Sequence, residues 1–94
     1  MQIVIAHSDE KYVERLRSFF YHLDVIQIQV FDNGFDVLTH IIEKKPKMVL
    51  IEENLPGLSA NDIKEAIFYK RIKTKLIILH LELLFDPDTH RYSH

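Results

Sequence analysis

The stretch that decides the fold is MVLIEENLPGLSA, residues 48–60. It opens with four apolar residues in a row, which is typical of a strand buried on both faces of a sheet. The polar residues 52–54 mark the end of that strand, and the proline and glycine that follow favour a turn. Ser59 or Asn61 can then cap a helix. The stretch therefore predicts a buried strand with acidic groups at its carboxyl end, followed by a turn and a helix.

The same alternation of strand and helix extends outward in both directions. Ile3 opens another continuous apolar run, whereas residues 26–30 alternate apolar and polar side chains, as a strand nearer the edge of a sheet does. Apolar residues recur at helical spacing between the strands, and Asp9 or Ser8 can cap the first helix. We expect strands at residues 3–6, 26–30, 48–51 and 76–79, and helices across residues 13–23, 35–42 and 63–67. This β-α-β-α-β-α-β pattern implies parallel pairing through crossover helices, and so a three-layer α/β fold.

The composition fits one compact domain. The chain has 94 residues, 47% of them hydrophobic, and a formal net charge of -2, so no strong field favours nucleic acid or an anionic membrane as a partner. It has no cysteine, which excludes disulfides and thiolate metal sites. Without a secretion signal or an apolar run long enough to span a membrane, we expect a cytoplasmic protein. We assign residues 1–84 to the domain and residues 85–94 to a polar C-terminal tail.

Residues 48–60 resemble the strand, phosphoacceptor and following loop of the receiver domain of two-component response regulators, the CheY-like domain. Residues 3–9, the turn at residues 32–34 and residues 76–80 fall at the corresponding places in the same order. The resemblance covers nearly the whole chain, and it implies a flavodoxin-like parallel sheet with strand order 2-1-3-4. It also implies that several polar strand ends lie together at one edge of that sheet.

The residues at the family's phosphorylation positions differ from the family pattern. Glu52 occupies the position of the acceptor aspartate, His7 and Ser8 those of the cation-binding acidic pair, and His80 that of the switch hydroxyl. A shift of one residue could instead bring Asp9 inward. The sequence ends before a fifth strand with the family's lysine, so the resemblance is to a degenerate and C-terminally shortened receiver. Phosphoryl transfer needs a cation and a lysine to offset the charge that develops on the phosphoryl group.

The sequence therefore favours an atypical receiver, or pseudo-receiver, over a working phosphorelay component. We expect no enzymatic activity and a phosphorylation-independent role as a protein-interaction module in bacterial signal transduction or transcriptional control. The alternative is a phosphoryl-accepting or metal-dependent two-component switch that uses Glu52. Glu52 could also imitate a phosphorylated state through its permanent charge, or simply end its strand in solvent. A third alternative is an unrelated small α/β protein, but the sequence contains no nucleophile-base pair and no glycine-rich phosphate loop that would support it.

Two groups of side chains could bind a metal ion, although we expect no cofactor. His7, Glu52 and His80 should lie near one another if the strand order is 2-1-3-4, and two imidazoles with a carboxylate suit zinc. Magnesium would need more oxygen ligands than this edge supplies. His90 and His94 are four residues apart, but the tail around them has weak helical character.

The fourth strand predicts self-association. Residues 76–84 contain seven apolar side chains and form a strand and exit too apolar for an open sheet edge, which would invite pairing with another chain. We expect a homodimer through this edge, unless a further segment of a longer regulator covers it. The aromatic residues of the first helix could form a second partner surface; they are Tyr12, Phe19, Phe20 and Tyr21.

Overall fold

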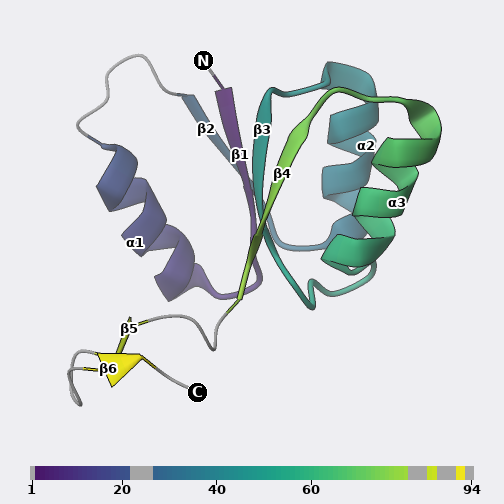
Figure 1. Cartoon of the computed structure of the whole chain (residues 1–94). Helices are drawn as coiled ribbons and strands as arrows, with labels where there is room; N and C mark the ends of the chain where they lie inside the picture. The colour runs from purple at the N-terminus through teal and green to yellow at the C-terminus, as the bar shows by residue number, and fades with distance from the viewer. Residues whose placement is uncertain (1, 22–26, 81–84, 87–90, 93–94) are drawn as a thin grey trace.

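Figure 1 shows the computed structural model of the protein, which describes residues 2–21, 27–80, 85–86 and 91–92. The order of elements is β1 (Gln2–Ala6), α1 (Glu10–Phe20), β2 (Gln27–Phe31), α2 (Gly34–Lys44), β3 (Met48–Glu52), α3 (Ala60–Lys70), β4 (Lys75–Leu79), β5 (Phe85–Asp86) and β6 (Arg91–Tyr92). The predicted alternation of four strands and three helices is confirmed.

The first four strands form one parallel sheet in the order β2-β1-β3-β4, as the sequence predicted. β1 and β3 occupy the centre, and their residues are almost all buried because both faces of the sheet are covered. The less apolar strand β2 lies at one edge, and β4 lies at the other. All four strands end at the same side of the sheet, which is the lower side in Figure 1.

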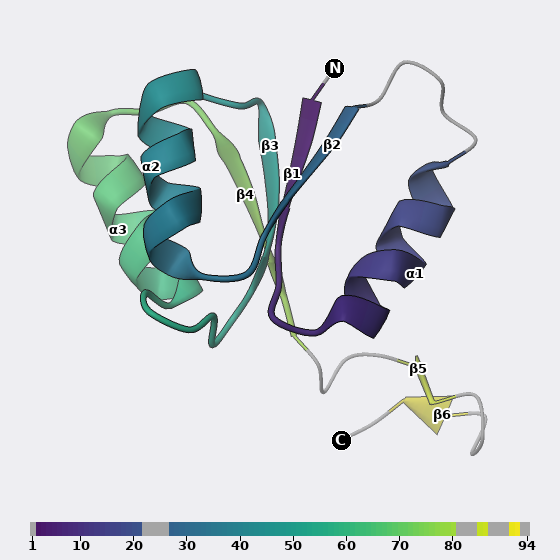
Figure 2. The same cartoon turned by 180° about the vertical axis from the view of Figure 1, so that it is seen from behind.

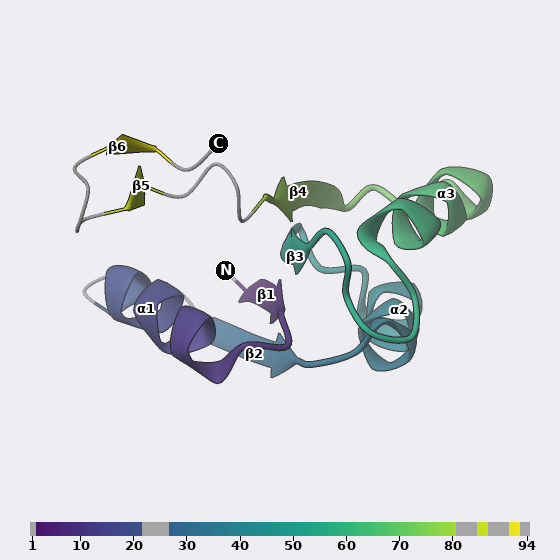
Figure 3. The ribbon, with the colours of Figure 1, turned by 90° about the horizontal axis from the view of Figure 1, so that it is seen from below.

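The helices cover the two faces unequally. α1 lies on one face, while α2 and α3 lie side by side on the other (Figures 2 and 3). Alternate residues of each strand contribute to the two cores because successive side chains point to opposite faces. Val4 and Val49 belong to the larger core under α2 and α3, whereas Ile5 and Leu50 pack toward Val13 of α1.

Each helix begins at a polar side chain that accepts a hydrogen bond from the first turn. Asp9 caps α1, Asn33 caps α2, and Ser59 caps α3 in a reciprocal capping box with Asp62. Of the alternatives that the sequence left open, the structure therefore selects Asp9 over Ser8 and Ser59 over Asn61. This choice leaves Ser8 available for another contact.

Two glycines hold the loop after β3 against the start of α2. The Gly34 N–H donates to the Pro56 carbonyl at 2.7 Å, and a Cβ atom on Gly34 would lie 2.3 Å from the Leu58 carbonyl oxygen. Gly57 has φ +88°, a conformation that L side chains rarely adopt. The loop after β3 is therefore positioned by backbone contacts that only glycine permits.

Some predicted bounds differ from the structure. α1 ends at Phe20, so the predicted extension of the first helix to Leu23 falls outside the described residues, as does Ile26 at the start of the second predicted strand. Within the predicted polar tail, β5 and β6 pair antiparallel, with Phe85 opposite Tyr92. The residues between the two strands in the sequence are polar and typical of turns, so the sequence predicted a polar tail and not a pair of strands. The predicted apolar exit at Leu81, Leu83 and Leu84 and the His90 and His94 pair also lie outside the described residues.

Candidate functional site

The candidate site lies where β1 and β3 end side by side. His7 follows the last residue of β1, and Glu52 is the last residue of β3. The two strands are hydrogen-bonded neighbours with Ala6 opposite Ile51, so the residues that follow emerge at the same edge. The structure therefore brings His7, Ser8 and Glu52 together, as the resemblance implied.

Ser8 donates two hydrogen bonds to one oxygen of Glu52. The Ser8 N–H lies 2.9 Å and the Ser8 Oγ 2.8 Å from Glu52 Oε1. The Glu52 side chain is only 15% exposed, so these donors offset much of the solvation that the carboxylate loses. We call this pair of contacts the Ser8–Glu52 latch. It joins the loop after β1 directly to the end of β3.

His7 is the buried polar residue of the site and packs against Tyr12. Its ring lies parallel to the Tyr12 ring, with 4.2 Å between centroids and 6° between planes, and the residue is 3% exposed. Nδ1 accepts a hydrogen bond from the Asp9 N–H at 3.0 Å and lies 3.8 Å from Glu52 Oε1. A neutral ring in this arrangement carries its proton on Nε2, which has no hydrogen-bond partner among the described residues.

Tyr12 is a site residue whose role the sequence did not reveal. The aromatic pattern of α1 suggested a partner surface, and Phe19 and Tyr21 are indeed exposed. Tyr12 is instead partly buried, and its ring covers one face of the His7 ring. Burial raises the pKa of the Tyr12 hydroxyl group. The signal available in the sequence was its position in the first turn of the helix that follows His7.

Asp9 does not point into the site as a cation ligand. Its side chain accepts a hydrogen bond from the Lys11 N–H at 2.9 Å and caps α1. The one-residue shift that would have turned Asp9 inward is therefore not what the structure shows. The positions that the resemblance assigned to the acidic pair hold the Ser8 donors of the latch and the buried imidazole of His7.

His80 belongs to a separate contact. Its Nδ1 lies 3.0 Å from Glu53 Oε2, and the two residues directly follow the paired ends of β4 and β3. Glu52 is thus engaged by Ser8 and His7, and Glu53 by His80. The predicted zinc group of His7, Glu52 and His80 is not assembled, and the described part of the chain contains no group of three histidine or acidic residues that could hold a metal ion.

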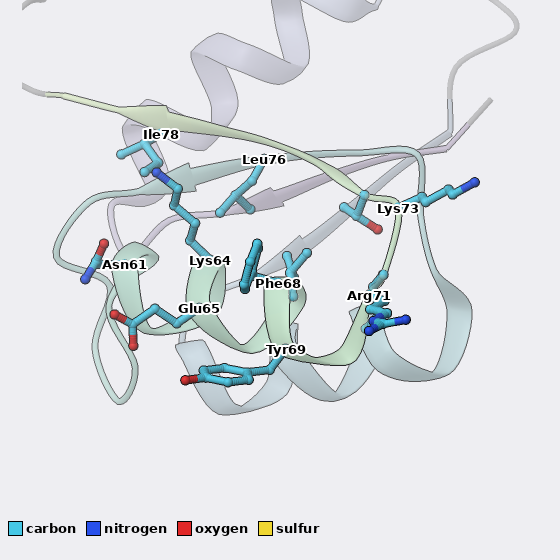
Figure 4. A pocket seen from close by; sticks show the side chains of 12 residues that line it. Asn61, Lys64, Glu65, Phe68, Tyr69, Arg71, Lys73, Leu76 and Ile78 are labelled. Atoms are coloured by element: carbon cyan, nitrogen blue, oxygen red, sulfur yellow. The ribbon is translucent and has the colours of Figure 1, made fainter.

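A second feature is an open groove between α3 and β4. Figure 4 shows Phe68 on the side of α3 toward Leu76 of β4, with Ile78 farther along β4 and with Arg71 and Lys73 toward the other end of the groove. Sequence reasoning identified the apolar fourth strand but not the contribution of α3. No helix among the described residues is long and apolar enough to cross a membrane.

Comparison with known proteins gives matches in structure but not in sequence. No protein-family model matches the chain, and no curated protein matches it. The DNA-binding response regulator of the LuxR family from Staphylococcus aureus superposes with a TM-score of 0.75 at 21% identity, over 94% of this chain and 72% of that one. The receiver domain of the Francisella response regulator 1452 gives a TM-score of 0.77 at 20% identity, over 94% of this chain and 70% of that one.

A further neighbour is the signal receiver domain of a protein named as a Luxo repressor, from Vibrio parahaemolyticus. It gives a TM-score of 0.77 at 19% identity and covers 82% of this chain, which spans 58% of that neighbour's length. The matched part contains the four-stranded parallel sheet and its helices. This protein therefore has the CheY-like fold of response-regulator receiver domains, as the sequence predicted.

Proposed function

We propose that this chain is a pseudo-receiver: a receiver-like module of signal transduction or transcriptional control that acts through protein contacts and without phosphorylation. The observation that carries the proposal is the Ser8–Glu52 latch. Glu52, at the position of the family's acceptor aspartate, accepts two hydrogen bonds with one carboxylate oxygen. Both donors belong to Ser8, at the position of one of the family's cation ligands. The latch closes by hydrogen bonding the gap that a metal ion would otherwise bridge.

The charges around Glu52 also disfavour attack on a phosphodonor. An incoming phosphoryl group would have to displace the Ser8 donors. The described contacts of Glu52 are with Ser8 and His7, and they include neither a lysine to offset the phosphoryl charge nor an acidic pair to bind a cation. The glutamate side chain is also one methylene longer than aspartate, and in-line transfer tolerates little displacement of the nucleophile. His80, at the switch-hydroxyl position, is paired with Glu53. A response to phosphorylation would therefore start from a longer acceptor side chain, without the family's acidic pair and without its switch hydroxyl.

The experiment is incubation of the protein with acetyl phosphate and Mg²⁺, followed by intact mass measurement at short times. A receiver domain with an aspartate acceptor serves as the positive control for the donor and for survival of the acyl phosphate. We expect no adduct on this chain. A stoichiometric phosphate adduct that disappears in Glu52→Gln would overturn the proposal and establish the phosphoryl-accepting switch instead.

We propose protein partners, with a second copy of this chain bound through the open edge of β4 as one of them. Among the described strands, β4 pairs with β3 alone, and the residues of α3 beside it include Phe68, which is 80% exposed. A cytoplasmic location remains a prediction from the sequence.

A further inference from the structure

His7 is the only polar or charged residue that is fully buried in the described part of the chain. Its backbone N–H donates to the Phe31 carbonyl at 2.9 Å, and the Tyr12 ring stacks on its imidazole. An imidazole can take up a positive charge near neutral pH, and a buried charge requires a partner. The groups around this ring therefore decide what a second proton does to the site.

The hydrogen bonds of the ring suit its neutral form. Nδ1 accepts from the Asp9 N–H at 3.0 Å, so it carries no proton in this arrangement. Nε2 then carries the proton of the neutral ring. A second proton would bind at Nδ1 and face the Asp9 N–H, donor against donor. Because Asp9 is the N-cap of α1, charging the ring would break the contact that holds the start of this helix.

A new acceptor for that proton lies nearby. Nδ1 is 3.8 Å from Glu52 Oε1, and a shift of about 1 Å would bring the two atoms to the distance of a charge-assisted hydrogen bond. That oxygen already accepts both donors of the Ser8–Glu52 latch. Ser8 directly follows His7 in the chain, so the segment that carries the ring also carries the latch donors. The charged ring and Ser8 would therefore compete for the same oxygen.

The sheet places two carboxylate residues at the positions on either side of His7. The residues that precede Asp32, His7 and Glu52 are paired across the three neighbouring strands, so these three follow in one row. Side chains in one row of a parallel sheet lie on the same face. Negative charges in neighbouring positions favour the charged imidazole. Glu52 is the nearer of the two by its printed contact with the ring.

Other groups at this edge oppose the charged ring or stay neutral. The amino-terminal end of α1, which has the positive end of the helix dipole, follows His7 and opposes a second positive charge. Burial raises the pKa of the Tyr12 hydroxyl above 10.0, so the stacked phenol is uncharged near neutral pH. The remaining charged residues here are Asp9, which caps α1, Glu53, which lies beside His80, and the exposed Glu10 and Lys11. A charged His7 thus depends on Glu52.

We propose that His7 is a pH-sensitive element of this site: its protonation at mildly acidic pH moves Nδ1 from the Asp9 amide to Glu52 and opens the Ser8–Glu52 latch. The inference rests on the proposed function, because it takes the closed latch as the resting form of the pseudo-receiver. It adds a proton as the signal to which the site responds. The change is transmitted to α1 through the lost contact with its N-cap residue.

The experiment is an NMR titration of the ¹⁵N-labelled full chain from about pH 8 to about pH 5, without a phosphodonor. Long-range proton–nitrogen spectra report which nitrogens of each imidazole carry a proton, and amide spectra report Ser8 and Asp9. We expect Nδ1 of His7 to change from an unprotonated to a protonated nitrogen. The amides of Ser8 and Asp9 should move with the same midpoint, because both lose their acceptors in that step.

Two variants separate this transition from the titration of other groups. In His7→Asn, the amide oxygen can accept from the Asp9 N–H but the side chain takes no charge, so the Ser8 and Asp9 amides should stay in place. His80→Gln removes the other histidine of this edge and should leave the transition unchanged. Circular dichroism verifies that each variant is folded.

A His7 ring that stays neutral to about pH 5 would overturn the inference, and this result needs no variant. A Ser8 amide that moves without the His7 ring, or that still moves in His7→Asn, would also overturn it, because Glu52 itself would then be the titrating group. The acetyl phosphate test is independent of these results. A chain that takes no phosphate and whose His7 stays neutral would keep the pseudo-receiver proposal and lose only the pH response.

Discussion

The Ser8 N–H and Ser8 Oγ both donate to Glu52 Oε1, at 2.9 Å and 2.8 Å. The acceptor is a carboxylate that is only 15% exposed, and two donors from one residue offset part of the solvation that it loses. The ends of β1 and β3 are thereby joined by a direct hydrogen-bonded contact.

Removing the Ser8 hydroxyl should weaken this contact. Ser8→Ala eliminates one of the two donors to a charged acceptor, and we expect the free energy of unfolding to fall by about 1 kcal/mol. Urea denaturation monitored by circular dichroism measures the change. Ser18→Ala, at an exposed position of α1, is the matched control and should not destabilise the fold. Equal effects of the two substitutions would show that the latch contributes nothing.

Glu52→Gln tests whether the charge, and not only the shape, of the acceptor matters. Glutamine keeps an oxygen that can accept from Ser8, but it loses the charge that strengthens both hydrogen bonds, so we expect a loss of about 1–2 kcal/mol in unfolding free energy. Glu65→Gln, at an exposed position of α3, is the control. If Glu52 imitates a phosphorylated state, the substitution should in addition change amide chemical shifts beyond the loop after β1; shifts confined to that loop would contradict the imitation.

The stacking of Tyr12 on His7 should appear in an alkaline titration. Burial raises the pKa of the Tyr12 hydroxyl above its ordinary value of 10.0, so the folded state favours the protonated phenol. The resulting stabilisation is complete below pH 10 and is lost as the pH rises through the raised pKa. Absorbance at alkaline pH should show one late-titrating tyrosine that disappears in Tyr12→Phe and persists in Tyr69→Phe. Its persistence in Tyr12→Phe would contradict the assignment.

The close approach of Gly34 to Leu58 predicts a large effect of a small substitution. A Cβ at Gly34 would overlap backbone atoms that cannot move independently, so we expect Gly34→Ala to destabilise the protein by about 2–3 kcal/mol. Gly57→Ala strains a positive φ and brings a Cβ to 2.8 Å from Cδ2 of Phe35, but that exposed side chain can move aside, so the substitution should cost about 1 kcal/mol. Urea denaturation again measures both effects. A smaller loss for Gly34→Ala than for Gly57→Ala would contradict the described packing of the loop.

The fold could be predicted because its determinants are local. Apolar runs such as residues 48–51 and the alternation at residues 27–30 specify central and outer strands, and parallel pairing then follows from the intervening helices. Helix ends were less certain, because neighbouring residues such as Ser8 and Asp9 can each act as a cap. Only the three-dimensional arrangement showed which of the two was used.

The site was predicted in its location but not in its contacts. Strand order placed His7 and Glu52 at one edge, and it also suggested that His80 would join them. The structure pairs His80 with Glu53 instead, because adjacent residues of a strand point to opposite faces and His80 meets the other carboxylate. Side-chain direction at a strand end depends on the loop that follows, and no periodicity in the sequence reports it.

The amide resonance of Ser8 offers the most direct test of the central claim, that Glu52 is held by Ser8 and takes up no phosphate. The measurement is a ¹⁵N-resolved spectrum of the full chain before and after addition of Mg²⁺ and acetyl phosphate. We expect the Ser8 amide to keep its position throughout and to move in Glu52→Gln, which weakens its acceptor. A shift of the Ser8 amide on addition of the phosphodonor to the unchanged chain, absent in Glu52→Gln, would contradict the account.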